Sequence, residues 1–390
     1  MSTRVRLFIF LISLAGWQVA AGLESTAPSQ RAPHRLMADA VDGRLDDFTL
    51  LEAALIAGGC GPEDVQRALD NYRRSRNNLF REISEDQSPE EKSRNLFRLM
   101  HKAVLTGKYE LSSSSVAETL SNGDYNCLSA TIIYQSLCNE IHLPVVSVAL
   151  PGHVRNQFRG RTQFAIEPTC AEWFDRRSIR RSTTQRWPAE NRPVTEITNV
   201  QLIARVYYNR ATDHLSHRRF GDAVDMLQFC VKLDPEHAAS RTNLLAALNN
   251  WALALCEDGH FAKAAQRLNE GFALAPRHEP FLANDLYVRG RWVRALCEQG
   301  DFRRALSILQ AAQRRRPTVS MFCQGQVVVI DLWARSLAEN SKDEDPVLSV
   351  HRIAKTLIEQ GQSELADRMR KKVRTLTAKV ADPRLTTGDM

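Results

Sequence analysis

The sequence lacks several patterns that would assign a function at once. It has no CxxC pair and no grouping of Cys and His at metal-ligand spacing, so we expect no metal and no other cofactor. It also lacks a nucleic-acid reader motif and aromatic residues interleaved with basic ones. A net charge of +7 over 390 residues is moderate, so we expect no nucleic-acid partner.

What the chain does contain is typical of a globular protein. Hydrophobic residues make up 43% and charged residues 25% of the sequence, which argues against disorder. A length of 390 residues exceeds one ordinary core and predicts two or three domains. Beyond the N-terminus, no apolar run approaches transmembrane length.

Residues 1–21 have the pattern of a secretory signal peptide. Two arginines precede an apolar run that begins at Leu7, and a small-residue Val-Ala-Ala sequence ends at Ala21. We expect cleavage after Ala21, a secreted or periplasmic protein, and no stable membrane insertion afterwards. The alternative is an uncleaved N-terminal anchor, because the apolar run is nearly long enough to cross a thin bilayer. Residues 22–34, rich in Ser, Pro, Ala and Gln, predict a disordered lead-in.

One cysteine occupies a position that favours reactivity. The turn residues 122–124 lead into an apolar helical pattern that runs to Ile141, and Cys127 stands at its start. Either Asn126 or Asp124 can cap the free amides of that helix. Because the positive end of a helix dipole favours thiolate, this is a suitable place for a nucleophile.

The residues after this helix can supply a base and a carboxylate. Residues 145–150 predict a buried strand, and a hairpin is expected to follow it with Gly160 at the turn in positive φ. A register centred on Gly160 places His153 directly opposite Glu167. An imidazole that is oriented by a carboxylate and lies beside a helix-start thiol is the arrangement used in nucleophilic acyl chemistry.

These residues resemble the transglutaminase-like superfamily. The resemblance rests on Cys127 at a helix start, on Leu-Pro-Gly-His ending at His153, and on Ala-Ile-Glu-Pro-Thr around Glu167. In that family a Cys, a His and an Asp form a papain-like triad. The resemblance therefore implies that Cys127 is the nucleophile, His153 the base and Glu167 the orienting carboxylate. It covers roughly residues 45–169 and is nearest to bacterial proteins in which such a core precedes tetratricopeptide repeats.

The chain departs from the family pattern at one position. Glu167 stands where the family usually has Asp, and its side chain is one methylene longer but chemically equivalent. The alternative interpretation of the same residues is a buried structural Cys127 and a surface His153.

A period of 41 residues runs through the second half of the chain. Four residue types recur at this step: Phe220, Phe261 and Phe302; Ala223, Ala264 and Ala305; Leu227, Leu268 and Leu309; Pro235, Pro276 and Pro317. Ala, then Leu four residues on, then Pro twelve residues on resembles the second helix of a tetratricopeptide repeat (TPR). The standard repeat has 34 residues, so each unit here carries about two additional helical turns.

Together the patterns predict an α+β transglutaminase-like (papain-like) domain followed by an all-α TPR solenoid. The expected segments are the transglutaminase-like domain over 35–181, a linker over 182–199, three repeats over 200–320, and capping helices over 321–380.

Two functions compete. In the first, the protein is a secreted cysteine acyl-transfer or amide-hydrolysing enzyme: Cys127 attacks an amide carbonyl, His153 moves the proton, and Glu167 holds the imidazole. Helix-start amides would stabilise the oxyanion, and either water or an amine would resolve the acyl-enzyme. In the second, the first domain is a catalytically inactive transglutaminase-like scaffold and the protein is an interaction module. A protein or peptide ligand is then expected on the concave face of the repeats.

Overall fold

The structure is a computed structural model that describes residues 28–174, 194–339 and 346–381. The predicted signal peptide lies outside these residues, as do residues 22–27 of the predicted lead-in and the greater part of the predicted linker. Residues 28–34 of the lead-in belong to a helix that begins at Pro28, in contrast to the predicted disorder. The chain divides into two compact units, Met1–Ile203 and Ala204–Met390, and each is described separately. Within the described ranges, no helix has the length and apolar character needed to cross a membrane.

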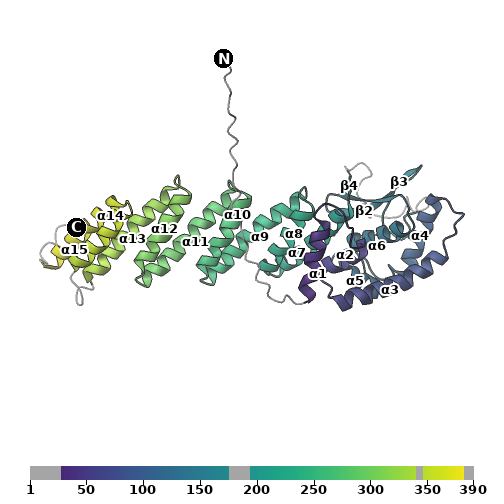
Figure 1. Ribbon diagram of the computed structural model, residues 1–390, viewed down its shortest axis with the longest axis horizontal. Coiled ribbons are helices and arrows are strands. Elements are labelled where there is room, and N and C mark those ends of the chain that lie inside the picture. Colours follow the sequence, from purple (N-terminus) through teal and green to yellow (C-terminus); the bar gives the residue numbers. More distant parts are fainter. Residues whose placement is uncertain (1–27, 175–193, 340–345, 382–390) are drawn as a thin grey trace, which may run out of the picture. The chain divides into compact units, whose positions relative to one another are not determined.

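The first unit begins with helices whose starts follow from local chemistry. Thr49 and Ser88 each form a capping box with the glutamate three residues on, and proline occupies the first turn of the helices that begin at residues 62 and 89. From residue 28 on, where the description begins, five helices precede the one that carries Cys127 (Figure 1): α1 (Pro28–Ala40), α2 (Leu50–Ala57), α3 (Pro62–Arg81), α4 (Pro89–Ala103) and α5 (Val116–Asn122).

Helix α6 (Cys127–Glu140) is the centre of this unit. Its eleven consecutive residues from Leu128 to Cys138 are all buried, because strands cover one side and α2, α4 and α5 cover others. A helix that is buried all round has little amphipathic character, and its position is therefore determined on every side. The Tyr134 hydroxyl donates to the Ser93 carbonyl at 2.8 Å and so fixes α6 against α4.

One antiparallel sheet of four strands follows α6 in the order β3-β2-β1-β4. Its strands are β1 (Val145–Leu150), β2 (His153–Arg159), β3 (Gln163–Ile166) and β4 (Thr195–Ile197). β1 and β2 both contact α6, as Figure 1 shows for β2. The turn between these two strands includes Gly152, whose φ of +72° favours glycine.

The hairpin between β2 and β3 differs from the predicted one. Arg159 stays in the ladder, paired with Gln163, so the loop is residues 160–162 and the hairpin is centred one residue later than expected. Continuing this register places Glu167 opposite Arg155 and makes His153 a diagonal neighbour of Glu167. The predicted direct pairing of His153 with Glu167 is therefore wrong. Gly160 does not adopt positive φ, and its lack of a side chain matters because a Cβ there would overlap the Phe158 ring.

The predicted α+β fold class is also wrong. The described residues form fifteen helices and a single small antiparallel sheet, so helices dominate both units. Among the described residues of the first unit, the strands lie at residues 145–166 and 195–197, and the other regular elements are helices. The short motif around Cys127 specifies a local arrangement of three side chains, and it does not determine how much sheet surrounds them.

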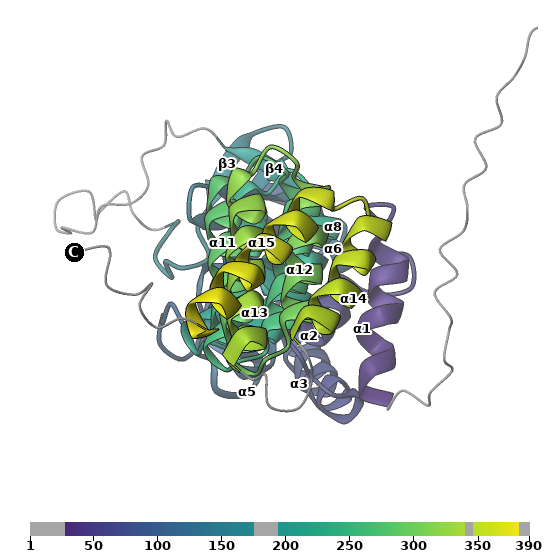
Figure 2. The ribbon, with the colours of Figure 1, turned by 90° about the vertical axis from the view of Figure 1, so that its left-hand side faces the viewer.

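The second unit is a series of antiparallel helix pairs, which Figures 1 and 2 show side by side. Three 14-residue helices begin at the repeated phenylalanines, and three 20-residue helices alternate with them. The repeated Ala264 and Leu268 are fully buried, as close helix packing requires. The bounds are α7 (Asn199–Ser216), α8 (Phe220–Leu233), α9 (Ala238–Glu257), α10 (Phe261–Leu274), α11 (Glu279–Glu298), α12 (Phe302–Arg315), α13 (Ser320–Glu339), α14 (Pro346–Glu359) and α15 (Ser363–Ala381).

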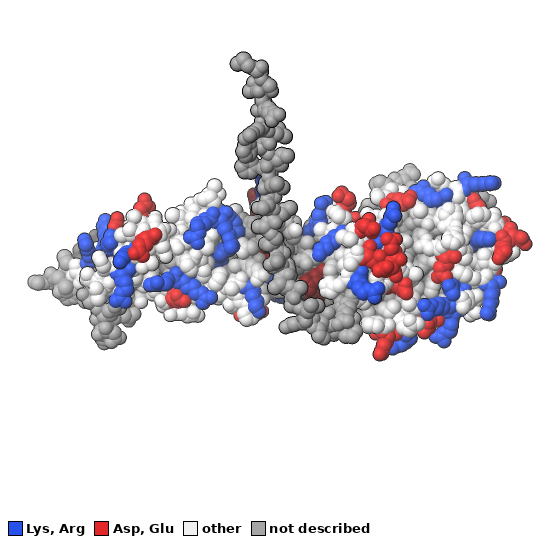
Figure 3. All heavy atoms as spheres, viewed as in Figure 1, with Lys and Arg blue, Asp and Glu red and all other residues white. Residues whose placement is uncertain are grey.

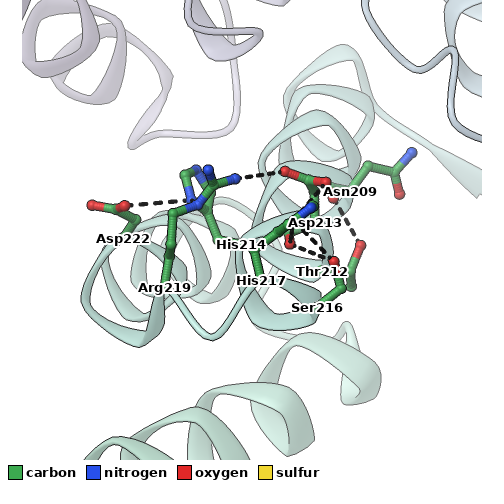
Figure 4. A network of polar contacts seen from close by, with 8 residues as sticks. All are labelled: Asn209, Thr212, Asp213, His214, Ser216, His217, Arg219 and Asp222. Atoms are coloured by element: carbon green, nitrogen blue, oxygen red, sulfur yellow. Dashed lines mark hydrogen bonds and ion pairs between the residues drawn. The ribbon is translucent and has the colours of Figure 1, made fainter.

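The turn between α7 and α8 is built differently from the equivalent turns of the next two pairs. Arg218 has a φ of +57°, whereas those turns place glycine at this position with φ of +76°, Gly259 and Gly300. A polar network surrounds this turn (Figure 4): Arg219 donates from Nη2 to Asp213 Oδ2 at 2.9 Å and from Nε to His214 Nδ1 at 2.9 Å. These bonds hold a left-handed residue that costs about 1–2 kcal/mol when it is not glycine.

Candidate active site

Cys127 is the first residue of α6, and Asn126 rather than Asp124 caps that helix. The Asn126 side chain accepts from the amides of Leu128 at 2.8 Å and Ser129 at 3.1 Å. Asp124 instead accepts from the Lys108 amide at 2.8 Å. The cap therefore uses later amides of the first turn, and the Cys127 amide is not among its donors.

His153 and Glu167 meet through their side chains. His153 opens β2, Glu167 follows the last residue of β3, and His153 Nε2 lies 2.8 Å from Glu167 Oε2. The Glu167 carboxylate is 2% exposed and the imidazole 16% exposed. Diagonal neighbours on a sheet are about 7–8 Å apart at the backbone, so the longer side chain of glutamate suits this register.

The second oxygen of Glu167 is held by Thr169, a residue that the sequence interpretation did not single out. Thr169 Oγ1 donates to Glu167 Oε1 at 2.6 Å, and the Thr169 amide donates to the same oxygen at 3.3 Å. The signal in the sequence was a hydroxyl residue two positions after the acid, a spacing at which side chain and backbone readily bond. Thr169 leaves Oε2 free to face the imidazole.

The thiol and the imidazole are also close. Burial lowers the pKa of His153, but hydrogen bonds with Cys127 and Glu167, and the charges of both groups, raise it to about 9. Because Glu167 occupies Nε2, the remaining ring nitrogen Nδ1 is the one available to the thiol. The structure thus brings together all three residues singled out from the sequence. A protonated imidazole is the favoured form at neutral pH.

The other cysteines provide a contrast. All eight are free of disulfides, and Cys127 is partly exposed. Cys138, on the same helix, is fully enclosed, and burial raises its pKa well above the usual range. Cys256 is also buried, with a pKa raised by burial. Among the described residues, no group of three or more His, Cys, Asp or Glu is placed to hold a metal ion.

Comparisons with known proteins add little to this geometry. No protein-family model matches the chain, and no curated protein matches it by sequence. Among solved structures it is similar to the crystal structure of menin, reported with its binding site for the Mixed Lineage Leukemia (MLL) protein. The TM-score is 0.37 and the identity 9%, and the alignment covers 90% of this chain and 82% of that one. A TM-score this low does not establish a shared fold. The transglutaminase-like relationship stays a prediction from the residues.

Proposed function

We propose that the protein is a cysteine-dependent acyl-transfer or amide-hydrolysing enzyme with Cys127, His153 and Glu167 as its active site. The observation that carries this proposal is the placement of one imidazole between a buried carboxylate at 2.8 Å and a helix-start thiol. A structural role alone would not need a partly buried, charge-paired histidine at this point, and perturbed titratable groups of this kind cluster at functional sites.

The geometry supports a two-step reaction. The Cys127 thiolate attacks the carbonyl carbon, and the electron pair moves onto the carbonyl oxygen, which the Cys127 amide at the start of α6 can meet. The imidazolium of His153 then gives its proton to the leaving amine as the C–N bond breaks. The resulting thioester is attacked by water or by an amine, whose proton passes to His153, and the thiolate leaves. Glu167 keeps the imidazole oriented through both steps.

Acylation of the full chain by p-nitrophenyl acetate tests this function. We expect a burst of p-nitrophenol equal to one acyl group per protein, located on Cys127 by peptide mass spectrometry. Added hydroxylamine should release the acyl group faster than water does, because it is the stronger nucleophile. Cys127→Ser is expected to lose the burst, while Cys256→Ser, which removes a buried thiol of the second unit, should keep it. A burst that persists in Cys127→Ser, or acylation elsewhere, would refute the assignment.

A second function, peptide binding, is favoured by a groove in the second unit. The groove lies between α11 and α13 and has a volume of about 640 Å³. Three large apolar side chains that line it are exposed: Met321, Val328 and Leu332. Gly325 lines it too, where a side chain would come close to Leu309. An open groove with an apolar floor between two helices suits an apolar peptide segment.

Charges at this groove are mixed, in keeping with the face of the molecule in Figure 3, where both signs occur on each unit. Arg294 and Arg335 line it together with Glu298 and Glu339, so apolar contact rather than charge would dominate recognition. Screening the full chain against an array of apolar peptides should give ligands whose binding is lost in Val328→Asp and kept in Cys127→Ser. Binding that is insensitive to Val328→Asp would place the ligand elsewhere.

A further inference from the structure

A short segment runs beside the start of the nucleophile helix and carries two exposed apolar side chains. Tyr109 is 44% exposed and Leu111 is 82% exposed, the largest fraction among the exposed large apolar residues of the described chain. An exposed leucine is ordinary by itself. Its position next to a candidate nucleophile gives it significance.

The backbone of this segment is fixed against the entry to α6. Tyr109 forms a parallel bridge with Tyr125, and the Glu110 amide donates to the Tyr125 carbonyl at 3.0 Å. The Asn126 side-chain amide donates to the Leu111 carbonyl at 3.1 Å. The residue that caps the Cys127 helix therefore also anchors Leu111, and the exposed pair is held in place by backbone bonds.

Tyr109 lies beside Tyr125, two residues before Cys127. Its ring packs edge-on against Tyr125, with centroids 6.1 Å apart. Burial raises the pKa of Tyr109, and the nearby groups of Cys127 and Glu167 raise it further. The Tyr109 side chain is therefore near enough to Cys127 and Glu167 for their charges to act on it.

We propose that Tyr109 and Leu111 form an acyl-donor subsite, which selects substrates with an apolar or aromatic group beside the reacting carbonyl. This inference rests on the proposed function. A substrate carbonyl poised for attack lies about 3–3.5 Å from Cys127 Sγ. The substrate groups on one side of that carbonyl would then lie along residues 109–111, which flank Cys127. When a substrate group covers Tyr109 and Leu111, apolar surface of the enzyme and of the substrate is removed from water. This favours an apolar substrate group over a polar one.

Two probes separate this subsite from simple thiol reactivity. Chloroacetamide and N-benzylchloroacetamide carry the same electrophile and differ in the aromatic group. The rate of modification at Cys127 is measured for each in the full chain by peptide mass spectrometry and divided by its rate with glutathione. We expect the corrected rate to be about tenfold higher for the benzyl probe.

Variants then locate the preference. Tyr109→Ala and Leu111→Ser should each reduce the corrected ratio towards one, while Tyr109→Phe should preserve it because the ring and not the hydroxyl makes the contact. Val41→Ser, which removes an exposed apolar residue elsewhere in the first unit, is the matched control and should leave the ratio unchanged.

The outcomes distinguish the two proposals. A ratio near one in the natural protein, or a high ratio that survives Tyr109→Ala and Leu111→Ser, would overturn the subsite while leaving Cys127 as the nucleophile. Loss of the preference in Tyr109→Phe would also overturn it, because the hydroxyl would then be responsible. Failure of both probes to modify Cys127 would refute the proposed function on which the subsite depends.

Discussion

Replacing Glu167 by Asp shortens the side chain by one methylene and keeps its charge. It therefore tests whether the length of the glutamate side chain is needed to contact His153. Both carboxylate oxygens are engaged, one with His153 at 2.8 Å and the other with Thr169 at 2.6 Å. The observed register makes His153 a diagonal neighbour of Glu167. In Glu167→Asp the carboxylate withdraws by about 1.5 Å, one carbon–carbon bond. It cannot then keep both partners within the roughly 3.2 Å limit of a good hydrogen bond.

The expected magnitude follows from the bond that is lost. A hydrogen bond to a charged group contributes about 1.5–3 kcal/mol. Losing it destabilises the imidazolium and lowers the pKa of His153 from about 9 towards its ordinary value. In the proposed mechanism this imidazolium activates Cys127, so the alkylation rate near neutral pH should fall about 10- to 100-fold. Glu167→Asp should therefore lose at least as much reactivity as Glu167→Gln, which keeps the length and loses the charge.

The assay is the rate of Cys127 carboxamidomethylation by iodoacetamide from pH 5 to pH 10, followed at the peptide level. The exposed Cys323 serves as an internal reference in every sample. Thr169→Ser keeps the hydroxyl bond to Glu167 and should retain nearly the natural rate. If Glu167→Asp reacts within twofold of the natural protein, the reach argument is wrong and the two acids are interchangeable at this position.

Three further predictions concern stability, each read out by calorimetry of the full chain. Arg218→Gly should stabilise the second unit by about 0.5–1 kcal/mol because it removes left-handed strain, and no change would show that the polar network fully offsets that strain. Gly259→Arg should destabilise the unit by about as much, and no change there would refute the strain argument. Ala264→Trp should cost about 1–3 kcal/mol or more, since Ala264 is fully buried, and an unchanged transition would disprove the packing of α10. The raised pKa of His153 contributes at most about 3 kcal/mol to the free energy of unfolding. This contribution is fully present below the ordinary histidine pKa of 6.5 and is lost as the pH rises through the folded-state pKa of about 9. His153→Ala should abolish that decline, and a decline that persists would assign it to another group.

Local features of the site were predictable from the sequence. The helix that begins at Cys127 and the strand at residues 145–150 depend on near neighbours along the chain, and the structure has both of them. The same holds for the starts of α8, α10 and α12, because the repeated phenylalanines mark equivalent positions. Patterns of this kind report local periodicity directly.

Features that depend on a choice between similar local solutions were not predictable. Arg159 can occupy a hairpin loop or a strand equally well. Its pairing with Gln163 shifts the hairpin centre by one residue, which changes the residue opposite Glu167. The role of Thr169 becomes visible only when the orientation of the Glu167 carboxylate is known. The balance of helix and sheet does not follow from the three residue types of the candidate site. Function resides in such sites and can occur on different folds.

The central claim is that His153 activates Cys127. The most direct test is the alkylation rate of Cys127 at pH 7 in the natural protein and in His153→Ala, measured beside Cys138 and Cys256 in the same chain. In the natural protein, the account predicts rapid alkylation of Cys127 and little alkylation of the two buried thiols. In His153→Ala, the alkylation rate of Cys127 should be at least tenfold lower, because the imidazolium is gone. Equal rates at Cys127 in the two proteins would contradict the account and leave the groove of the second unit as the functional part.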